Sequence, residues 1–379
     1  MKKNTVILHF QPLELFPPVM NFITTASNKK EFAGNLDVFS TKNDKSQFEY
    51  SNDNVKLNRL KGIAPHFGKL EKLIRYFAIY GRMTLFLLQK KPKTVVYFET
   101  LSALPVILYY FLSSKKNKPS VYIHYHELVT ISELSKGRWL NKKINSLEQK
   151  IYKHIKWISQ TNYKRLEIFS EQYRLNIENK KLNTLPNYPP SSWLKKSRHE
   201  AESTKNTVIK LIHIGALSTK GMYLENVLEH FGGDPQFTLD FYSHNFTNET
   251  RELISRYENC SIHGSIAYQE IPKLKGLYDV GLVLYNGMST NVKFCAPNKI
   301  FEYLALDLDV WCSDKLITAR DYERLDCYPK MIMVDYENLE EFDVVTALDR
   351  KGLNYIQSPY VCEPVYEKLL NVINENTHS

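Results

Sequence analysis

The chain has 379 residues, too many for one ordinary hydrophobic core and suited to two domains of about 150–200 residues each. Its net charge of +9 is unevenly divided. Residues 1–190 hold 31 Lys and Arg against 14 Asp and Glu, a balance of +17, and the remaining 19 and 27 give the second half −8. The first half therefore suits an anionic partner, for which nucleic acid and an anionic membrane surface are the usual candidates.

Cysteine usage and hydropathy exclude several classes of protein. The N-terminal apolar run is short and is broken by Gln11, Pro12 and Glu14, so we expect a first buried strand rather than a signal peptide. The longest apolar run, Leu101–Leu112, is too short to cross a membrane. The cysteines are scattered without a CxxC pair, which argues for reduced thiols in the cytoplasm and against a disulfide or zinc framework. They are Cys260, Cys295, Cys312, Cys327 and Cys362.

The first element is a buried strand over Thr5–Phe10, followed by a helix through Met20–Ala26. Residues 41–62 are polar and charged, and we expect a loop there. From Lys69 to Gln89, apolar residues recur at helical spacing with Lys and Arg between them. Such a basic amphipathic helix either lies on a membrane or packs on a sheet with a basic outer face.

The rest of the first half alternates strands with helices, the pattern of a parallel, doubly wound sheet. The predicted strands are Thr94–Phe98, Val121–His124, Trp157–Ser159 and Leu182–Leu185. The predicted helices are Leu104–Leu112, Arg138–His154 and Asn162–Gln172.

After a Pro- and Ser-rich stretch at residues 188–206, which is typical of a linker, the same alternation restarts. Two such sheets would leave a cleft at the carboxyl ends of their strands, where open parallel sheets bind ligands. The predicted strands are Val208–Ile214, Phe237–Tyr242, Ser261–His263, Val280–Tyr285 and Met331–Val334. The predicted helices are Leu224–His230, Asn248–Tyr257, Gln269–Leu277 and Tyr366–Asn374.

The stretch Ala296–Ser313 predicts a helix that begins at Pro297 and runs into a short apolar strand. Asn298 and Lys299 lie in the first turn, where free N–H groups and the helix dipole favour an anion. Glu302 follows one turn later. This arrangement can hold a phosphate and a sugar hydroxyl, although an ordinary amphipathic helix has the same pattern.

Five segments, in order along the chain, resemble those of bacterial two-Rossmann (GT-B type) glycosyltransferases of the group-1, or family-4, kind. PNKIFEYLALDLDVWCS resembles their donor-site helix, usually close to PNKLFEYLAAGLPVVAS. HIGALSTKGMYLENVL, from His213, is similar to the glycine loop and first helix of their second domain. The segments from Tyr122 (YIHYHELV), Thr184 (TLPNYPP) and Ser261 (SIHGSIAYQEIPKLKGLYDVGLVLYN) resemble three others.

The resemblance implies two Rossmann-like α/β domains facing a central cleft. Residues 1–190 would be a basic acceptor-binding domain and residues 191–206 a linker. Residues 207–355 would bind the nucleotide-sugar donor, and residues 356–379 would form a C-terminal helix able to pack back on the first domain.

The activity implied is transfer of a hexose from a UDP- or GDP-sugar to a saccharide acceptor, often lipid-linked, in surface polysaccharide (capsule or lipopolysaccharide) or glycolipid synthesis. Members with this helix mostly retain the anomeric configuration and need no metal or other cofactor. We therefore expect a cytoplasmic protein, peripheral at the inner face of the plasma membrane and held there by its basic first domain. No nucleic-acid recognition motif is present, so we expect no nucleic-acid partner.

The resemblance also assigns residues to the donor. Glu302 would bind the ribose hydroxyls, and Asn298 and Lys299 would line the donor site. Lys220, in the loop after Gly215, would pair with the diphosphate, because cations aimed at a departing nucleoside diphosphate lower the barrier without a metal. His244 could reach the base or the diphosphate.

His126 and Glu127 are the catalytic candidates of the first half. By resemblance, His126 would lie near the transferred sugar, with Glu127 orienting it or a nearby helix. His124 and His126 share one side of a strand, and with Glu127 they could bind zinc, but no further ligand is evident from the spacing and we predict no metal. The alternative for His126 is a core histidine at a strand end.

Three departures from the family pattern leave alternatives open. Phe294 replaces a second glutamate, Asp307 and Asp309 replace the usual glycine and proline after the helix, and Ala216 replaces an arginine. The alternatives are a degenerate homologue that binds nucleotide or membrane without turnover, and a sugar-nucleotide 2-epimerase, which shares the fold.

Overall fold

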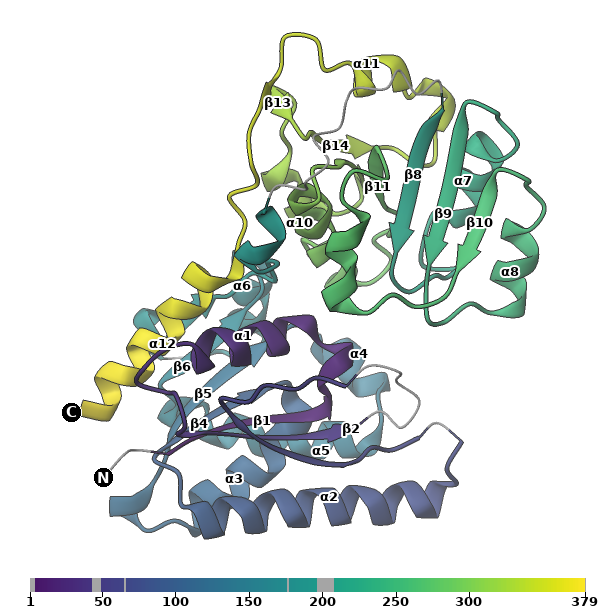
Figure 1. Cartoon of the computed structure of the whole chain (residues 1–379). Coiled ribbons are helices and arrows are strands. Elements are labelled where there is room, and N and C mark those ends of the chain that lie inside the picture. The colour runs from purple at the N-terminus through teal and green to yellow at the C-terminus, as the bar shows by residue number, and fades with distance from the viewer. Residues whose placement is uncertain (1–3, 43–48, 65, 176, 196–207, 379) are drawn as a thin grey trace. The chain divides into compact units, whose positions relative to one another are not determined.

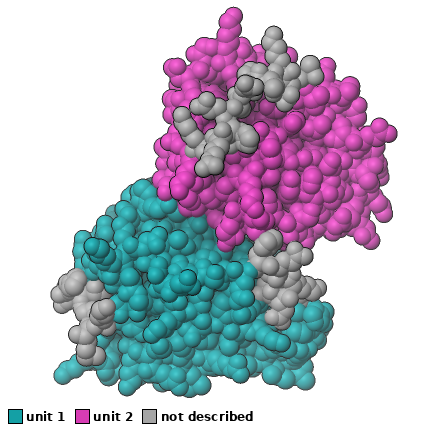
Figure 2. Space-filling view, in the orientation of Figure 1, with its two compact units in different colours: residues 1–187, 362–379 teal, residues 188–361 magenta. Residues whose placement is uncertain are grey.

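Two separate parallel sheets form the framework of the chain in the computed structural model, which describes residues 4–42, 49–64, 66–175, 177–195 and 208–378 (Figure 1). The chain divides into one unit of Met1–Asn187 with Cys362–Ser379 and a second of Tyr188–Val361 (Figure 2). Each unit contains one of the sheets, so the predicted fold class of two α/β domains with parallel sheets is confirmed. No helix in the described ranges has the length and apolarity needed to cross a bilayer.

The first sheet has the strand order β3-β2-β1-β4-β5-β6-β7, and all its strands are parallel. The loop expected over residues 41–62 is wrong in part, because Lys56–Lys61 forms the edge strand β3. An edge strand has one unpaired side exposed to water, so KLNRLK lacks the apolar signal of a central strand. The strands are β1 Thr5–Pro12, β2 Leu36–Lys42, β3 Lys56–Lys61, β4 Thr94–Phe98, β5 Ser120–Tyr125, β6 Trp157–Gln160 and β7 Leu182–Thr184.

Helices cover both faces of this sheet. Helices α2, α3 and α5 lie on one face, where their apolar residues form a core with those of the central strands (Figure 1). On the other face, α1 packs beside α12: the Phe22 and Tyr366 rings lie 5.5 Å apart, and the Tyr366 hydroxyl donates to the Pro18 carbonyl at 3.0 Å. The helices are α1 Pro17–Ser27, α2 Lys69–Lys90, α3 Ala103–Leu112, α4 Ile131–Lys136, α5 Trp139–Glu148, α6 Tyr163–Gln172 and α12 Cys362–His378.

The second sheet has the order β10-β9-β8-β11-β12-β14. From β8 the chain runs outward to β9 and then returns to β11 on the opposite side, so the strand order reverses between β8 and β11. This is the position at which open α/β sheets bind ligands. The strands are β8 Ile209–Ile214, β9 Phe237–Tyr242, β10 Cys260–His263, β11 Val280–Val283, β12 Asp309–Ser313 and β14 Met331–Val334, and a separate pair is formed by β13 Cys327–Tyr328 and β15 Asn354–Tyr355.

The predicted helix–strand stretch is observed as α10 followed by β12, with Pro297 as the N-cap of the helix. The helix expected over Gln269–Leu277 is instead a 3-10 helix over Tyr268–Leu274, because Pro272 inside it cannot donate a backbone hydrogen bond. The α-helices of the second unit are α7 Leu224–Phe231, α8 Asn248–Ile254, α9 Thr290–Lys293, α10 Asn298–Ala305 and α11 Val344–Leu348.

Helix α10 sits directly on the two central strands. Gly281 on β11 has no side chain, and a Cβ there would overlap the ring of Tyr303, which fills the space. The Tyr303 hydroxyl in turn accepts the N–H of Ile214, at the end of β8, at 2.8 Å. Close approach at Gly281 therefore fixes α10 over the point where the strand order reverses.

Of the stretch expected to be a linker, residues 191–206, the structure describes 191–195. Ser191–Leu194 form a short 3-10 helix, and Trp193 is buried among the apolar residues of the second unit. The rest of that prediction lies outside the described residues.

Candidate functional site

Three loops at the carboxyl edge of the second sheet are tied together into one loop rim, made of residues 215–223, 243–245 and 285–287. Asn245 accepts the N–H of Leu217 at 3.0 Å, which joins the loops after β9 and β8. Asn286 donates its own N–H to the Gly221 carbonyl at 3.1 Å and its side-chain amide to the Lys220 carbonyl at 2.9 Å, which joins the loop after β11. These bonds fix the backbone beside the switch point.

The first two turns of α10 bring together three of the predicted donor residues. The side-chain amide of Asn298 donates to one carboxylate oxygen of Glu302, and the ammonium of Lys299 donates to the other. The Glu302 side chain is 1% exposed and that of Lys299 is 16% exposed. A nearly buried carboxylate is therefore neutralised within one helical turn, and each of its oxygens retains a further lone pair for a ligand hydroxyl.

Gly215 brings the loop rim to this helix turn. A Cβ built on Gly215 would lie 3.8 Å from the Cε atom of Lys299 and 3.8 Å from the Nε2 atom of His213, so the lysine stem runs beside the glycine. The φ angle of +143° at Gly215 is one that other residues rarely adopt. A phosphate can therefore approach this backbone beside a cation.

His213 itself is structural. Its ring nitrogens lie 3.2 Å from the Leu282 carbonyl and 3.3 Å from that of Ala216. Burial, with a smaller effect from the charge of Lys299, lowers the pKa of His213 to about 4 against the opposing effect of these two carbonyls. The imidazole is therefore neutral at pH 7 and packs beneath the loop rim.

Lys220 and His244 are exposed on the same rim. The Lys220 backbone is held between Ser218 Oγ and Asn286, and His244 lies between Ser243 and Asn245, which are hydrogen-bonded to each other at 2.6 Å. Among the described residues, neither side chain forms a hydrogen bond or ion pair with the Asn298–Lys299–Glu302 cluster. Their backbones belong to the loop rim, of which Gly215 lies beside Lys299, and both residues are exposed to water.

His126 lies just after β5 in the first unit. Its ring stacks on Phe98, with centroids 5.5 Å apart and planes 7° from parallel, and Nδ1 lies 3.2 Å from the Asn187 side-chain oxygen. Burial lowers the pKa of His126 to about 4, so the ring is neutral. Because Nδ1 faces an acceptor, it carries the proton. The buried Nε2 atom, which has no hydrogen-bond partner among the described residues, is an acceptor.

Glu127 is directed elsewhere. Its carboxylate is 57% exposed and lies 4.0 Å from the guanidinium of Arg165. Arg165 is buried and donates to the His126 carbonyl at 2.7 Å, so it stabilises the backbone between His126 and Glu127. The ring of His126 is oriented by Phe98 and Asn187. Among the described residues, no group of three or more His, Cys, Asp or Glu could hold a metal ion.

Glu99 was not predicted from the sequence as a residue that positions His126. It follows β4 with φ 66° and ψ 149°, a conformation nearly restricted to glycine, and its carboxylate accepts the N–H of His126 at 2.6 Å. Burial, together with the charge of Glu127, raises the pKa of Glu99 to about 8. The available signal was an acidic residue directly after the apolar run TVVYF, at the end of a central strand.

His9 was also missed. Across the sheet, His9 pairs with Phe98, Phe98 with His124, and His124 with Ser159, so two histidines share one row at the carboxyl ends of their strands. Both ring nitrogens of His9 are buried. Burial, helped by the charge of His126, lowers the pKa of His9 to about 3 against the opposing effect of the Phe98 backbone. A histidine inside the apolar strand TVILHF was the available signal.

No family model matches the chain, and no curated protein sequence does. Solved structures match over nearly the whole chain. HepE of Anabaena, crystallised with UDP and glucose, has a TM-score of 0.66 at 9% identity, covering 98% of this chain and 100% of its own. The lipopolysaccharide outer core galactosyltransferase WaaB has a TM-score of 0.62 at 11% identity, with 98% and 99% covered. This chain has the GT-B fold.

The GT-B fold does not by itself select a reaction. A Listeria monocytogenes protein assigned as a UDP-N-acetylglucosamine 2-epimerase matches as well, with a TM-score of 0.60 at 11% identity, covering 100% of this chain and 97% of its own. Function is therefore argued from the site residues.

Proposed function

We propose that this GT-B protein is a glycosyltransferase that moves a hexose from a UDP- or GDP-sugar to a saccharide acceptor. The observation that carries the proposal is the cluster of Asn298, Lys299 and Glu302, which begins α10 beside Gly215 at the switch point of the second sheet. The complex of HepE with UDP and glucose supports a sugar nucleotide as the ligand.

The cluster suggests an exchange of partners when the donor binds. In the structure, Lys299 neutralises Glu302. A diphosphate beside Gly215 would attract the Lys299 ammonium, and the freed Glu302 oxygen would accept the ribose hydroxyls. Lys220 would supply a second cation from the loop rim, and His244 would contact the base or the diphosphate.

These residues also suit the chemical step. Negative charge grows on the nucleoside diphosphate as it departs, and fixed cations and N–H groups stabilise it. A metal-independent reaction that retains the anomeric configuration is therefore part of the proposal, as the sequence resemblance implies. His126 is the candidate catalytic residue of the first unit, because a neutral imidazole whose buried Nε2 atom is an acceptor could bind a sugar hydroxyl that reaches it. Glu127 is a positioning candidate through Arg165.

The acceptor would be lipid-linked, and the pathway would build a surface polysaccharide or glycolipid. The net charge of +17 on residues 1–190 supports glycosyl transfer at the surface of an anionic membrane, with the protein peripheral at its cytoplasmic face.

The test is donor binding by a thermal-shift panel of UDP-, GDP-, ADP- and CMP-sugars, followed by hydrolysis and transfer assays. A donor at about 100 times its dissociation constant should stabilise the protein by about 2.7 kcal/mol. Glu302→Gln should weaken binding about tenfold or more, since it removes a charged acceptor, and Lys220→Met should weaken it less. Glu341→Gln and Lys351→Met, both exposed in the second unit, are matched controls. Equal affinity in the site and control variants would reject the site.

The epimerase is the second candidate, favoured by the similarity to the Listeria protein. Incubation with UDP-N-acetylglucosamine in the absence of any acceptor separates the two reactions. Appearance of the 2-epimer would establish epimerisation, and transfer to an added acceptor would establish the glycosyltransferase. Donor binding with neither product would identify a homologue that binds without turnover.

A further inference from the structure

The chain passes from the first unit to the second at the peptide bond between Asn187 and Tyr188. In the first unit, the Asn187 side-chain oxygen lies 3.2 Å from Nδ1 of His126, the candidate catalytic histidine. In the second unit, the ring of Tyr188 packs edge-on against that of Phe301 on α10, with centroids 4.5 Å apart. Two adjacent residues therefore contact the catalytic candidate of one unit and the donor helix of the other.

This peptide bond lies in a stiff segment, residues 186–190, in which three of the five residues are proline. Each proline fixes its φ angle at about −65°, and Pro189 restricts Tyr188 before it to extended backbone. Leu185, directly before the segment, is fully buried and donates its N–H to the carbonyl of the last residue of β6 at 2.9 Å. A displacement of the Tyr188 ring is therefore passed on to Asn187, because the backbone around them has little freedom to absorb it.

The second crossing between the units, after Val361, is held by the same aromatic side chain. The ring centroid of Tyr360 lies 5.1 Å from that of Phe301 and 5.3 Å from that of Tyr188. Tyr322 completes the cluster, with its ring 4.8 Å from Phe301 and its hydroxyl 3.4 Å from that of Tyr188. Phe301 is 1% exposed, so both crossings pack on one buried ring of the donor helix.

Beyond the second crossing, packed rings lead back to His126. Tyr366 on α12 lies 5.5 Å from Phe22 on α1, and Phe22 lies 5.4 Å from Phe98. Phe98 is the ring on which His126 stacks. From Phe301, one crossing thus reaches His126 directly, and the other reaches the ring that supports it.

We propose that Tyr188 and Asn187 are positioning residues, which set the orientation and the tautomer of the His126 ring according to the state of the donor helix. This inference rests on the proposed function, because it connects the two parts of the proposed site. Phe301 belongs to the same two turns of α10 as the donor residues, so an adjustment of these turns on donor binding moves the ring that holds Tyr188. Asn187 then accepts the Nδ1 proton of His126 in the geometry that leaves Nε2 as the acceptor for a sugar hydroxyl.

The test records the imidazole signals of the full chain by NMR with isotope-labelled histidine. The signal lost in His126→Gln identifies His126. Asn187→Ala removes the acceptor of Nδ1 and should turn one dominant tautomer into a mixture of two. Tyr188→Leu should shift the same signal in the same direction, whereas Tyr188→Phe, which keeps the ring, should reproduce the wild type. An unshifted His126 signal in Tyr188→Leu would overturn the proposal, since an aromatic cluster that only stabilises the second unit leaves His126 unchanged.

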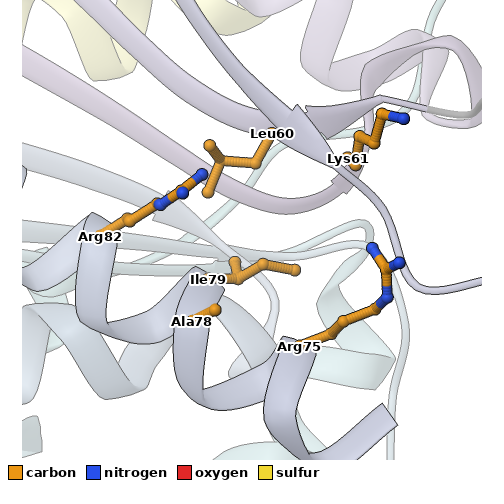
Figure 3. Close-up of a pocket in the computed structure, with 6 residues that line it drawn as sticks. All are labelled: Leu60, Lys61, Arg75, Ala78, Ile79 and Arg82. Atoms are coloured by element: carbon orange, nitrogen blue, oxygen red, sulfur yellow. The ribbon is translucent and has the colours of Figure 1, made fainter. Parts of the chain in front are cut away.

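Two substitutions outside the cluster are controls. Arg82→Gln alters an exposed cation of the first unit, which Figure 3 shows rising from α2 toward β3. Tyr355→Leu removes a tyrosine ring of the second unit that is 50% exposed. Neither should shift the His126 signal, and shifts of equal size in both would overturn the proposal. Thermal unfolding midpoints show whether each variant is folded, and Tyr188→Met replaces the leucine variant if that one is not.

A second measurement tests the dependence on the donor helix. UDP and GDP carry no sugar, and the one that binds should shift the His126 signal of the wild type. Tyr188→Leu should still bind it, because Asn298, Lys299 and Glu302 are intact, but the shift should fall to about half or less. An equal shift in both proteins would mean that the nucleotide acts on His126 without Tyr188, which would overturn the proposal.

Kinetics provide a further readout that a purely structural role would not give. With a sugar nucleotide that is hydrolysed, Tyr188→Leu should lower kcat about tenfold with little change in KM, since a misplaced catalytic group slows the chemical step more than binding. Tyr188→Phe should restore kcat. A raised KM with an unchanged kcat would overturn the positioning role.

The His126 signal is recorded without any substrate, so this inference and the proposed function can fail separately. If no sugar nucleotide binds but Tyr188→Leu shifts the signal, the proposed function alone fails. If sugar nucleotides bind and are hydrolysed but the signal is the same in Tyr188→Leu and the wild type, the positioning role alone fails.

Discussion

The carboxylate of Glu99 accepts the backbone N–H of His126 at 2.6 Å, and the Glu99 N–H donates to the His124 carbonyl at 3.1 Å. One acidic residue thus ties the end of β4 to the chain that leaves β5. The position of His126, the candidate catalytic histidine, depends on a residue held in an unfavourable backbone conformation.

The titration of Glu99 should make stability depend on pH. Its pKa is raised by burial to about 8 from 4.5. Between these values the folded chain keeps a proton that the unfolded chain has lost, so the free energy of unfolding falls as pH rises. Glu99→Gln removes this effect and should gain stability relative to the wild type between about pH 5 and pH 9 in urea unfolding. Glu171→Gln, at an exposed carboxylate, is the control. If the free energies of unfolding of Glu99→Gln and the wild type differed by a constant amount across that pH range, a raised pKa of Glu99 would be contradicted.

The backbone strain at Glu99 predicts an unusual order of stability. Glu99→Gly and Glu99→Ala both lose the hydrogen bond to His126, but only glycine adopts φ 66° and ψ 149° readily. The glycine variant should be the more stable by about 1–3 kcal/mol, measured from urea midpoints at equal slope. If the backbone at position 99 were unstrained, Glu99→Ala would be at least as stable as Glu99→Gly. Observing that order would therefore contradict the proposed strain.

Asp307 should contribute to stability and not to donor binding. It takes the left-handed conformation, with φ 61°, after α10, and its carboxylate pairs with Lys275 at 2.8 Å and accepts the Tyr355 hydroxyl at 3.0 Å. Asp307→Ala should be less stable than Asp307→Gly by about 1 kcal/mol, because alanine resists this conformation. Both should bind donor like the wild type, since an eight-residue helix, about 12 Å long, separates Asp307 from Asn298. Weakened binding in both variants would show that this helix end shapes the donor site.

Alanine substitutions at two glycines should affect different properties, stability at Gly281 and donor affinity at Gly215. Gly281→Ala would drive a methyl group into the ring of Tyr303 and should cost about 3 kcal/mol or more of stability in thermal unfolding. Gly215→Ala meets only ordinary contacts at 3.8 Å, so its cost is the smaller one of placing alanine at φ +143°. Its larger effect should be on donor affinity, because the added methyl group would occupy space beside Lys299 where the donor diphosphate is proposed to bind. Intact affinity in Gly215→Ala would place the diphosphate elsewhere.

The sequence predicts elements best where apolar runs are buried on both sides. The strands TVVYF and IKLIHI are clear for this reason. The helices α2 and α10 are clear because their apolar residues recur at helical spacing. The edge strand β3 and its neighbour β2 were not predicted. β3 is polar on its open side, and LDVFSTK mixes polar and apolar residues without a clear period.

The site is predictable only where its residues are close in sequence. Asn298, Lys299 and Glu302 fall within two turns of one helix, so spacing alone brings them together. Asn187, which faces the His126 ring, lies 61 residues further along the chain, and no local pattern indicates that contact. The backbone conformation of Glu99 is imposed by neighbouring strands, so it has no signature in the sequence around it.

The pairing of α12 with α1 has a consequence for biosynthesis. The hydroxyl of Tyr366 reaches the carbonyl of Pro18 across 348 positions of chain, and all of the second unit lies between them. On a ribosome, the second unit can fold completely while α1 still lacks its covering helix. A nascent chain halted before Cys362 would therefore expose Phe22 and its neighbours to chaperones, even though the residues of the first sheet had long been synthesised.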